Sequence, residues 1–137
     1  SSLMPMASLA AEKNDAPAAE KALPQPTAYF ENLKNGDTVT SPFKVKFGVT
    51  NMQVKPAGDM TPNSGHFHLL VDTALTPEQL KAPIPMDDQH KHFGKGQTET
   101  ELTLPPGKHT LQLVMADGNH MPHNPPVMSD KITVTVK

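Results

Sequence analysis

The stretch SPFKVKFGVT, residues 41–50, decides the fold, because apolar and polar residues alternate along it. Phe43, Val45 and Phe47 fall on one face of an extended chain, and the lysines between them fall on the other. A period of two is the pattern of a β-strand with one buried face. We therefore predict a strand here that covers one side of a hydrophobic core.

The same alternation returns in four later stretches, which turn residues separate. These stretches are HFHLLVD (66–72), TETELTL (98–104), KHTLQLVMAD (108–117) and SDKITVTVK (129–137). The Asn-Gly pair at 35–36 and the Pro-Pro-Gly at 105–107 mark tight turns. Several such strands with almost no helix predict an all-β fold, an antiparallel immunoglobulin-like β-sandwich.

One short helical turn is predicted in the stretch TPEQL, residues 76–80. Thr76 is suited to cap the turn, and Pro77 suits the first helical position. Gln79 can complete a capping box with Thr76. We expect no longer helix in the folded part of the chain.

Composition excludes several classes of protein. A chain of 137 residues is long enough for one domain. It has no cysteine, which excludes disulfides and thiolate metal sites. It has no arginine and a net charge of -2, which argues against a nucleic-acid partner. The chain has no apolar run of about 18 residues, so no membrane span is predicted.

The first 28 residues differ in composition from the remainder. Residues 1–11, SSLMPMASLAA, resemble the apolar end and small-residue cleavage site of a signal peptide. Residues 12–28 are rich in Ala, Pro and charge, which is typical of an extended, disordered linker. The β-sandwich domain is then expected over residues 29–137, in a protein that is periplasmic or secreted.

Histidine carries the candidate chemistry, because the seven histidines gather in short groups. His66 and His68 are two residues apart on a predicted strand, so both side chains lie on the same face. Two imidazoles so placed can bind one ion at about 2.0–2.1 Å from each nitrogen. The alternative is that both rings form hydrogen bonds at the end of a sheet.

Further candidate ligands lie in a long loop near the end of the chain. The segment DGNHMPHNPPVMSD, residues 117–130, is long for a hairpin loop. It includes His120, Met121 and His123. We expect the three prolines, Pro122, Pro125 and Pro126, to stiffen this loop over the H-x-H strand. The expected result is one polar patch of five histidines: His66, His68, His109, His120 and His123.

Three histidines are weaker candidates as ligands. His90 and His92 precede a Gly-rich loop and predict a second, more exposed site. His109 lies on an apolar strand face, where a hydrogen-bonded histidine at the edge of the core is the first expectation. Imidazole suits copper, zinc and nickel, and a methionine thioether favours copper(I). Copper is therefore the expected metal, with zinc as the alternative.

Four segments resemble an uncharacterised bacterial family of small exported β-domains, classed as a domain of unknown function. They are YFENLKNGDTVTSPFKVKFGV, GHFHLLVD, GKGQTETELTLPPGKHTLQLVMAD and GNHMPHNPPVMSDKITVTV. The motifs that carry the resemblance are G-H-x-H-L-L-V-D and L-P-P-G-x-H-T-L-x-L. The family's polar positions correspond here to His66, His68, Asp72, Gln97, Thr98, His109, Asp117, His120 and Ser129. The resemblance implies a β-domain and brings no reaction with it.

The sequence predicts an exported protein that binds a transition metal through histidine and methionine, for metal delivery, buffering or resistance. Its expected partners are the metal ion and another periplasmic protein. The alternative is a non-catalytic structural or protein/glycan-interaction module, whose histidines are hydrogen-bonded within the fold. An enzyme is not expected, because no serine lies beside an obvious base.

Overall fold

The structure is a computed structural model that describes residues 24–137. The expected signal-peptide remnant and most of the expected linker lie outside the described residues. The first strand begins at Thr27, two residues before the expected start of the domain at Tyr29. The elements are β1 (Thr27–Phe30), β2 (Thr38–Val39), β3 (Phe43–Thr50), β4 (Gln53–Val54), β5 (Ser64–Val71), the 3-10 helix η2 (Gln79–Lys81), β6 (His90–Phe93), β7 (Glu99–Leu102), β8 (Gly107–Ala116) and β9 (Ile132–Val136).

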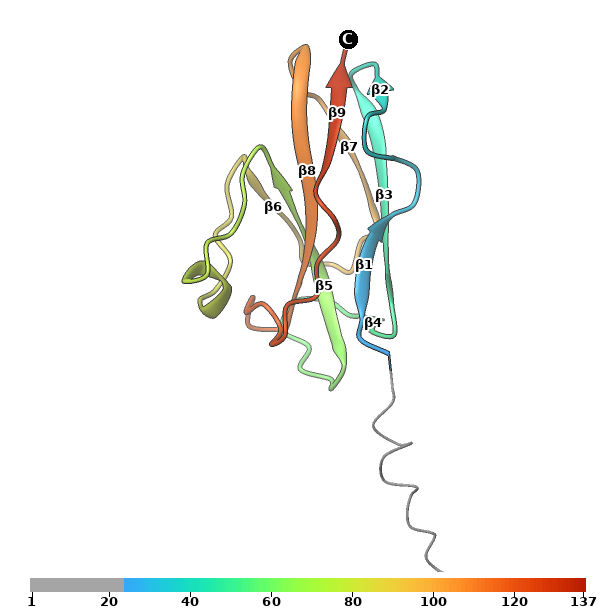
Figure 1. Ribbon diagram of the computed structural model, residues 1–137. Helices are drawn as coiled ribbons and strands as arrows, with labels where there is room; N and C mark the ends of the chain where they lie inside the picture. The colour runs from blue at the N-terminus through green and yellow to red at the C-terminus, as the bar shows by residue number, and fades with distance from the viewer. Residues whose placement is uncertain (1–23) are drawn as a thin grey trace, which may run out of the picture.

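The strands form two sheets, as Figure 1 shows. One sheet has the order β1-β3-β7, and the other has the order β2-β9-β8-β5-β4, with β6 also paired to β5. Most pairs are antiparallel, whereas the short pairs β2–β9 and β4–β5 are parallel. The predicted all-β sandwich is therefore confirmed.

The core lies between the two sheets. Phe43, Val45 and Phe47 of β3 are buried, and the lysines between them are exposed, as the alternation predicts. The rings of Phe47 and Phe67 pack with their centroids 4.8 Å apart, which joins the two sheets at the centre. Each buried side chain of this size contributes about 1.5–3 kcal/mol to folding.

The central strand β5 is buried on both faces. Its inner face contributes Phe67, Leu69 and Val71 to the main core. Its outer face is covered by the segments that follow β5 and β8. A second apolar cluster forms under this cover from Leu70, Ile84, Val114, Ala116, Leu75 and Met128. The outer face is therefore a covered layer, and the histidines of β5 lie within it.

The segment that covers the outer face carries the one predicted helical turn, which is confirmed as η2. The backbone N–H of Thr76 donates to the Gln79 side-chain oxygen over 2.9 Å. The N–H of Gln79 donates to the Thr76 hydroxyl over 3.1 Å. This reciprocal pair is the predicted capping box, although the helix itself begins only at Gln79. Within residues 24–137, no helix is long and apolar enough to span a membrane.

Candidate metal centre

Strand pairing brings the first two groups of histidines together. β6 runs antiparallel to β5, and His92 lies directly opposite His68. His66 lies two residues from His68, so all three side chains lie on the outer face. The pairing of β6 with β5 ends where Phe93 meets Phe67. The position beside His66 is therefore open to a side chain from another segment, and His120 approaches it from the loop after β8.

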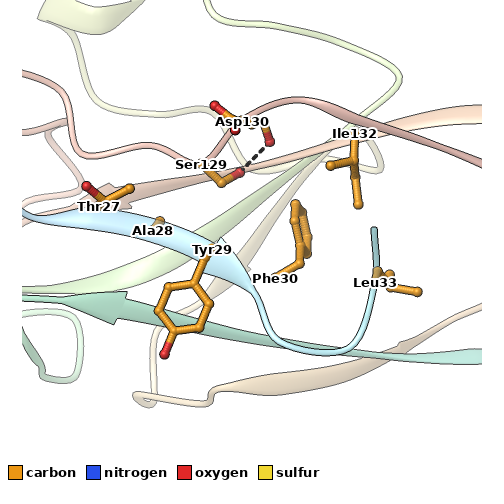
Figure 2. Close-up of a pocket in the computed structure, with 8 residues that line it drawn as sticks. All are labelled: Thr27, Ala28, Tyr29, Phe30, Leu33, Ser129, Asp130 and Ile132. Atoms are coloured by element: carbon orange, nitrogen blue, oxygen red, sulfur yellow. Dashed lines mark hydrogen bonds between the residues drawn. The ribbon is translucent and has the colours of Figure 1, made fainter. Parts of the chain in front are cut away.

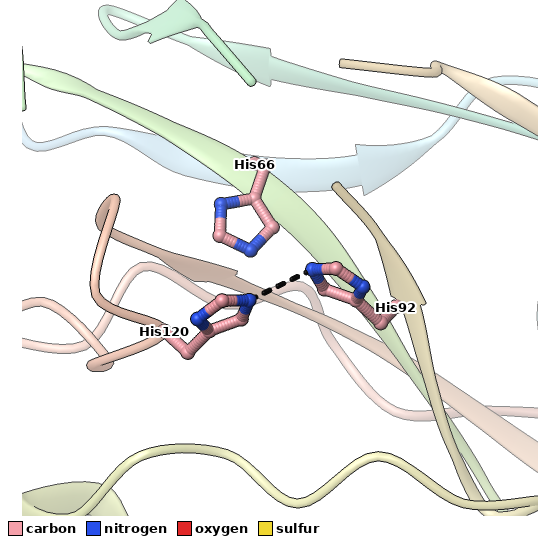
Figure 3. A group of neighbouring side chains, drawn as sticks. All are labelled: His66, His92 and His120. Atoms are coloured by element: carbon pink, nitrogen blue, oxygen red, sulfur yellow. Dashed lines mark hydrogen bonds between the residues drawn. The ribbon is translucent and has the colours of Figure 1, made fainter. Parts of the chain in front are cut away.

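Four imidazoles converge at this point, and we call them the histidine quartet: His66, His68, His92 and His120. Their ring centroids lie between 4.7 and 5.9 Å apart. The Nε2 atoms of His66 and His68 are 3.0 Å apart, as are those of His92 and His120. Figure 3 shows the rings of His66, His92 and His120 turned toward one another from three segments of the chain.

The spacing of the quartet fits a transition-metal ion. With bonds of about 2.0–2.1 Å, neighbouring ligand nitrogens are separated by about 2.9 Å in a square plane and about 3.3 Å in a tetrahedron. The two Nε2 separations of 3.0 Å lie within this range. One nitrogen from each of His66, His92 and His120 also lies within 4.8 Å of the other two. His66, His92 and His120 therefore form a cluster that can hold a metal ion, and His68 adds a fourth imidazole beside His66.

Burial favours the neutral form, which metals require, in three members of the quartet: His66, His68 and His92. His66 and His68 are fully buried. Burial lowers the pKa of His66 to about 4, and repulsion from His92 and His120 adds to the effect. Burial likewise lowers the pKa of His68 to about 3, followed by repulsion from His66. Burial also lowers the pKa of His92. Near neutral pH these rings therefore have free lone pairs for an ion.

The hydrogen bonds within the quartet leave some polar atoms unsatisfied. A neutral imidazole has one N–H and one lone pair, so one ring of each Nε2 pair donates and the other accepts. The Nδ1 atoms of His66 and His68 are buried and have no hydrogen-bond partner within residues 24–137. A buried polar atom without a partner costs about 1–3 kcal/mol and is uncommon. These two nitrogens therefore need partners that the hydrogen bonds within the quartet do not supply.

Two glycines make room for histidine rings. A Cβ atom at Gly94 would lie 2.7 Å from Nε2 of His92. A Cβ atom at Gly65 would lie 2.8 Å from Nε2 of His123 and 2.7 Å from the carbonyl oxygen of Ala116. Neither separation is possible for a real Cβ atom without movement of the neighbouring group. The glycine of G-H-x-H and the glycine after H-K-H-F therefore each shape the surroundings of a histidine.

A turn built on Asp117 presents His120 to the quartet. The Asp117 carboxylate accepts the backbone N–H groups of Asn119 and Met121 over 2.8 and 3.1 Å. His120 has a φ of 65°, in the left-handed region that histidine enters less readily than glycine. The N–H of Ile84 donates to the His120 carbonyl over 2.9 Å. The turn and the covering segment together hold His120 in place.

The predicted site residues are only partly brought together. His66, His68 and His120 lie together, and His92, which was expected in a separate site with His90, lies with them. The other two expected ligands, Met121 and His123, line a pocket beside η2. His90 lies beside the quartet and bonds to Asp87 through Nδ1 over 2.7 Å.

His109 lies outside the quartet, so the expected patch of five histidines is not formed. It stands opposite Val134 near the start of β8, whereas His68 stands opposite Val114 near its end. Its Nδ1 bonds to Asp72 over 2.7 Å and its Nε2 to the Pro105 carbonyl over 2.8 Å. The bond to Asp72 raises the pKa of His109. The first expectation for His109, a hydrogen-bonded histidine, is confirmed.

Two surface pockets lie near residues that the sequence singled out. Met121 and His123 line a pocket of about 400 Å³ between η2 and the proline-rich loop. Figure 2 shows a second pocket, of about 230 Å³, beside β1. The Ser129 hydroxyl in it donates to the Asp130 carbonyl and accepts the N–H of Leu113. Ser129 therefore holds the backbone together, and its hydroxyl is already engaged.

Fold and site together define a small β-sandwich domain with a buried cluster of imidazoles that can hold a metal ion. The chain belongs to the family described as "Domain of unknown function (DUF4399)", which matches residues 45–137. All four members of the quartet lie within the matched residues. The expected resemblance to a domain of unknown function is thereby confirmed.

Comparison with other proteins supports the architecture alone. No curated protein matches the chain. Among solved structures, the chain is similar to one described as the endo-beta-1,4-mannanase from Thermotoga petrophila, with a TM-score of 0.50 and 18% identity. The match covers 90% of this chain and 25% of that one, so this chain spans about a quarter of the mannanase chain. At this identity the likeness concerns the fold.

Proposed function

We propose that this protein binds a transition metal in the histidine quartet and acts in metal delivery, buffering or resistance. The supporting observation is the convergence of four imidazoles with Nε2 atoms 3.0 Å apart in two pairs. Lowered pKa values of His66 and His68 keep their lone pairs free at neutral pH. The composition of residues 1–28 favours export to the periplasm.

Copper is the preferred ion in this proposal. The quartet supplies only imidazole nitrogens, a donor set that suits copper, zinc and nickel. Among divalent first-row ions, a given nitrogen site binds copper(II) most tightly. Zinc is the alternative, because a tetrahedron of four nitrogens also satisfies it.

The arrangement of the ligands suits uptake and release. His66 and His68 lie on the central strand and are fully buried, whereas His92 and His120 are partly exposed. An ion therefore reaches the quartet from the side of His92 and His120. His120 is the one ligand on a loop, so movement of that loop opens the site without disturbing the sheet.

A titration tests the proposed function. Copper(II), copper(I) and zinc(II) are added in turn to metal-free protein without a histidine tag, in competition with a chelator. We expect the double variant His66→Ala, His68→Ala to bind copper more than about 100-fold more weakly, because even outer partners of a metal site contribute about 10–100-fold. His109→Ala is the matched control, since it removes a histidine outside the quartet. Equal affinities in the double variant and the wild type would contradict the proposal.

The alternative function is a non-catalytic interaction module. Two observations favour it: the Nε2 pairs lie at hydrogen-bond distance, and a pocket of about 400 Å³ opens between η2 and the proline-rich loop. The same titration separates the two functions. Metal binding that survives loss of the quartet, or no binding of any of the three ions, favours the module.

A further inference from the structure

Two aspartate–histidine pairs in this domain share the same hydrogen bond but differ at the second nitrogen of the histidine ring. In each, a carboxylate oxygen lies 2.7 Å from Nδ1 of the histidine: Asp87 with His90, and Asp72 with His109. The second nitrogen of His109 also has a partner, the Pro105 carbonyl. The second nitrogen of His90 is buried and has no partner within residues 24–137. Both ring nitrogens of His109 are therefore hydrogen-bonded, whereas Nε2 of His90 is buried without a partner among the described residues.

The unpartnered nitrogen of His90, Nε2, is a hydrogen-bond acceptor. Because Asp87 accepts the Nδ1–H of His90, the neutral ring carries its lone pair on Nε2. Asp87 is itself fixed, since its carboxylate also accepts the backbone N–H groups of Gln89 and His90 over 3.0 and 2.9 Å. The hydrogen bond from His90 is the main cause that lowers the pKa of Asp87, which keeps this carboxylate ionised. A buried lone pair of this kind needs a donor.

The matching donor is on the neighbouring strand. Nδ1 of His68 is buried without a partner, and it carries a proton whenever Nε2 of His68 gives its lone pair to an ion. His92 stands opposite His68, and His90 is two residues from His92 on the same face. His68 and His90 are thus diagonal neighbours, which long and aromatic side chains can bridge. His68 is fully buried and His90 is 8% exposed.

We propose that His90 is a positioning residue of the metal site. One buried water accepts the Nδ1–H of His68 and donates to Nε2 of His90, while Asp87 holds His90 in the accepting tautomer. This inference rests on the proposed function in one respect, because it gives Nε2 of His68 to the ion. The water bridge fixes the orientation of the His68 ring and makes it a stronger ligand.

The first test uses metal-free protein. Side-chain nitrogen NMR reports which nitrogen of each histidine carries the proton. We expect a proton on Nδ1 of His90, a proton on Nδ1 of His68 that exchanges slowly with solvent, and faster exchange of the latter in His90→Leu. A proton on Nε2 of His90 would overturn the proposal, because that nitrogen would then be a donor.

The second test uses copper(II) alone as the probe. We expect His90→Leu to weaken copper(II) binding about 10–100-fold and to shift the visible absorption band of the bound ion, because the His68 ring turns. His90→Gln should restore most of both, since its amide oxygen can accept in place of Nε2. His109→Leu is the matched control, because it breaks the same kind of aspartate–histidine pair outside the quartet. Wild-type affinity and spectrum in His90→Leu, or equal losses in His109→Leu, would overturn the proposal.

The two tests distinguish failure of this inference from failure of the proposed function. If the tautomers are as expected and the wild type binds none of the ions, the hydrogen bond stands and the metal function fails. If the wild type binds copper through the quartet and His90→Leu changes nothing, the metal function stands and the role of His90 fails.

Discussion

Histidines near the two ends of β8 occupy opposite electrostatic settings: His109 lies near its start, and His66 and His68 of β5 lie opposite its end. At one end, His109 lies against the Asp72 carboxylate, and this contact raises the pKa of its ring. At the other end, His66 and His68 face other imidazoles in a buried layer, and burial lowers the pKa of both. The first setting holds a proton, and the second keeps lone pairs free for a metal. The surroundings of a histidine therefore decide its chemistry here more than its strand does.

The largest expected difference between the two settings is in acid stability. The pKa values of His66 and His68 fall to about 4 and about 3 on folding, from an ordinary value near 6.5. Between these values the unfolded chain binds more protons, so the free energy of unfolding decreases as pH falls below about 6.5. We expect each ring to cost about 2–3 kcal/mol between pH 7 and pH 4.5. Urea unfolding of metal-free protein at several pH values measures this slope.

The control for acid stability is the variant His66→Leu, His68→Leu. Without the two buried rings, the slope below pH 6.5 should become clearly shallower. An unchanged slope would mean that other groups carry the acid sensitivity.

The next effect in size concerns the two loop histidines, His120 and His123. His120 belongs to the quartet, so we expect His120→Ala to weaken copper(II) binding by more than about 100-fold. His123 lies against Gly65 and lines the pocket beside η2, so His123→Ala should change the affinity by less than about threefold. Chelator competition measures both. Equal losses in the two variants would place His123 among the ligands.

A smaller effect is expected from filling the space that His92 occupies. In Gly94→Ala the new methyl group would lie 2.7 Å from Nε2 of His92, so the ring must move away. We expect copper(II) binding about tenfold weaker, with a change of less than about 1 kcal/mol in the free energy of unfolding, because the far end of a side chain yields easily. Lys95→Ala, at the next and exposed position, should leave the affinity unchanged. An unaltered affinity in Gly94→Ala would show that His92 is dispensable.

The smallest effect is expected at the proton-holding end of β8. His109→Leu removes a partly exposed charged hydrogen bond, worth about 1 kcal/mol. The pKa of His109 is raised on folding, so this contribution is complete below about pH 6.5 and is lost as pH rises through the raised value. Urea unfolding at pH 5.5 and pH 9 should therefore show a larger loss at the lower pH. A loss of equal size at both would contradict the role of the charge.

Local patterns in the sequence predict which face of a strand each of these histidines occupies, and several of the local contacts. A period of two is enough to place Phe67 in the core and His66 and His68 on the other face of β5. The capping box of Thr76 and Gln79 is likewise local, because its partners are three residues apart. The proline-rich loop returns to β5 as expected, since its ends are held by the strands beside it.

The missing part of the site depends on pairing between distant segments. His92 stands opposite His68 only because β6 pairs with β5 in one particular register. A long covering segment connects the two strands, and no local sequence pattern predicts its path. The only hint in the sequence is that H-K-H repeats the period of H-F-H. The expected patch of five histidines does not form for a related reason. The sequence predicts the face of β8 on which His109 lies, but the distance of His109 from His68 depends on the register of the strands.

A final consequence follows from the positions of the quartet along a chain that has no cysteine. His66, His92 and His120 come from segments far apart in sequence, so one bound ion would link three parts of the polypeptide, as disulfides do in small secreted domains. An ion that binds only the folded form adds about 4 kcal/mol at a free concentration 1,000 times its Kd. The covering segment between β5 and β6 would then open less often to proteases, and metal supply would affect how long the protein survives proteolysis.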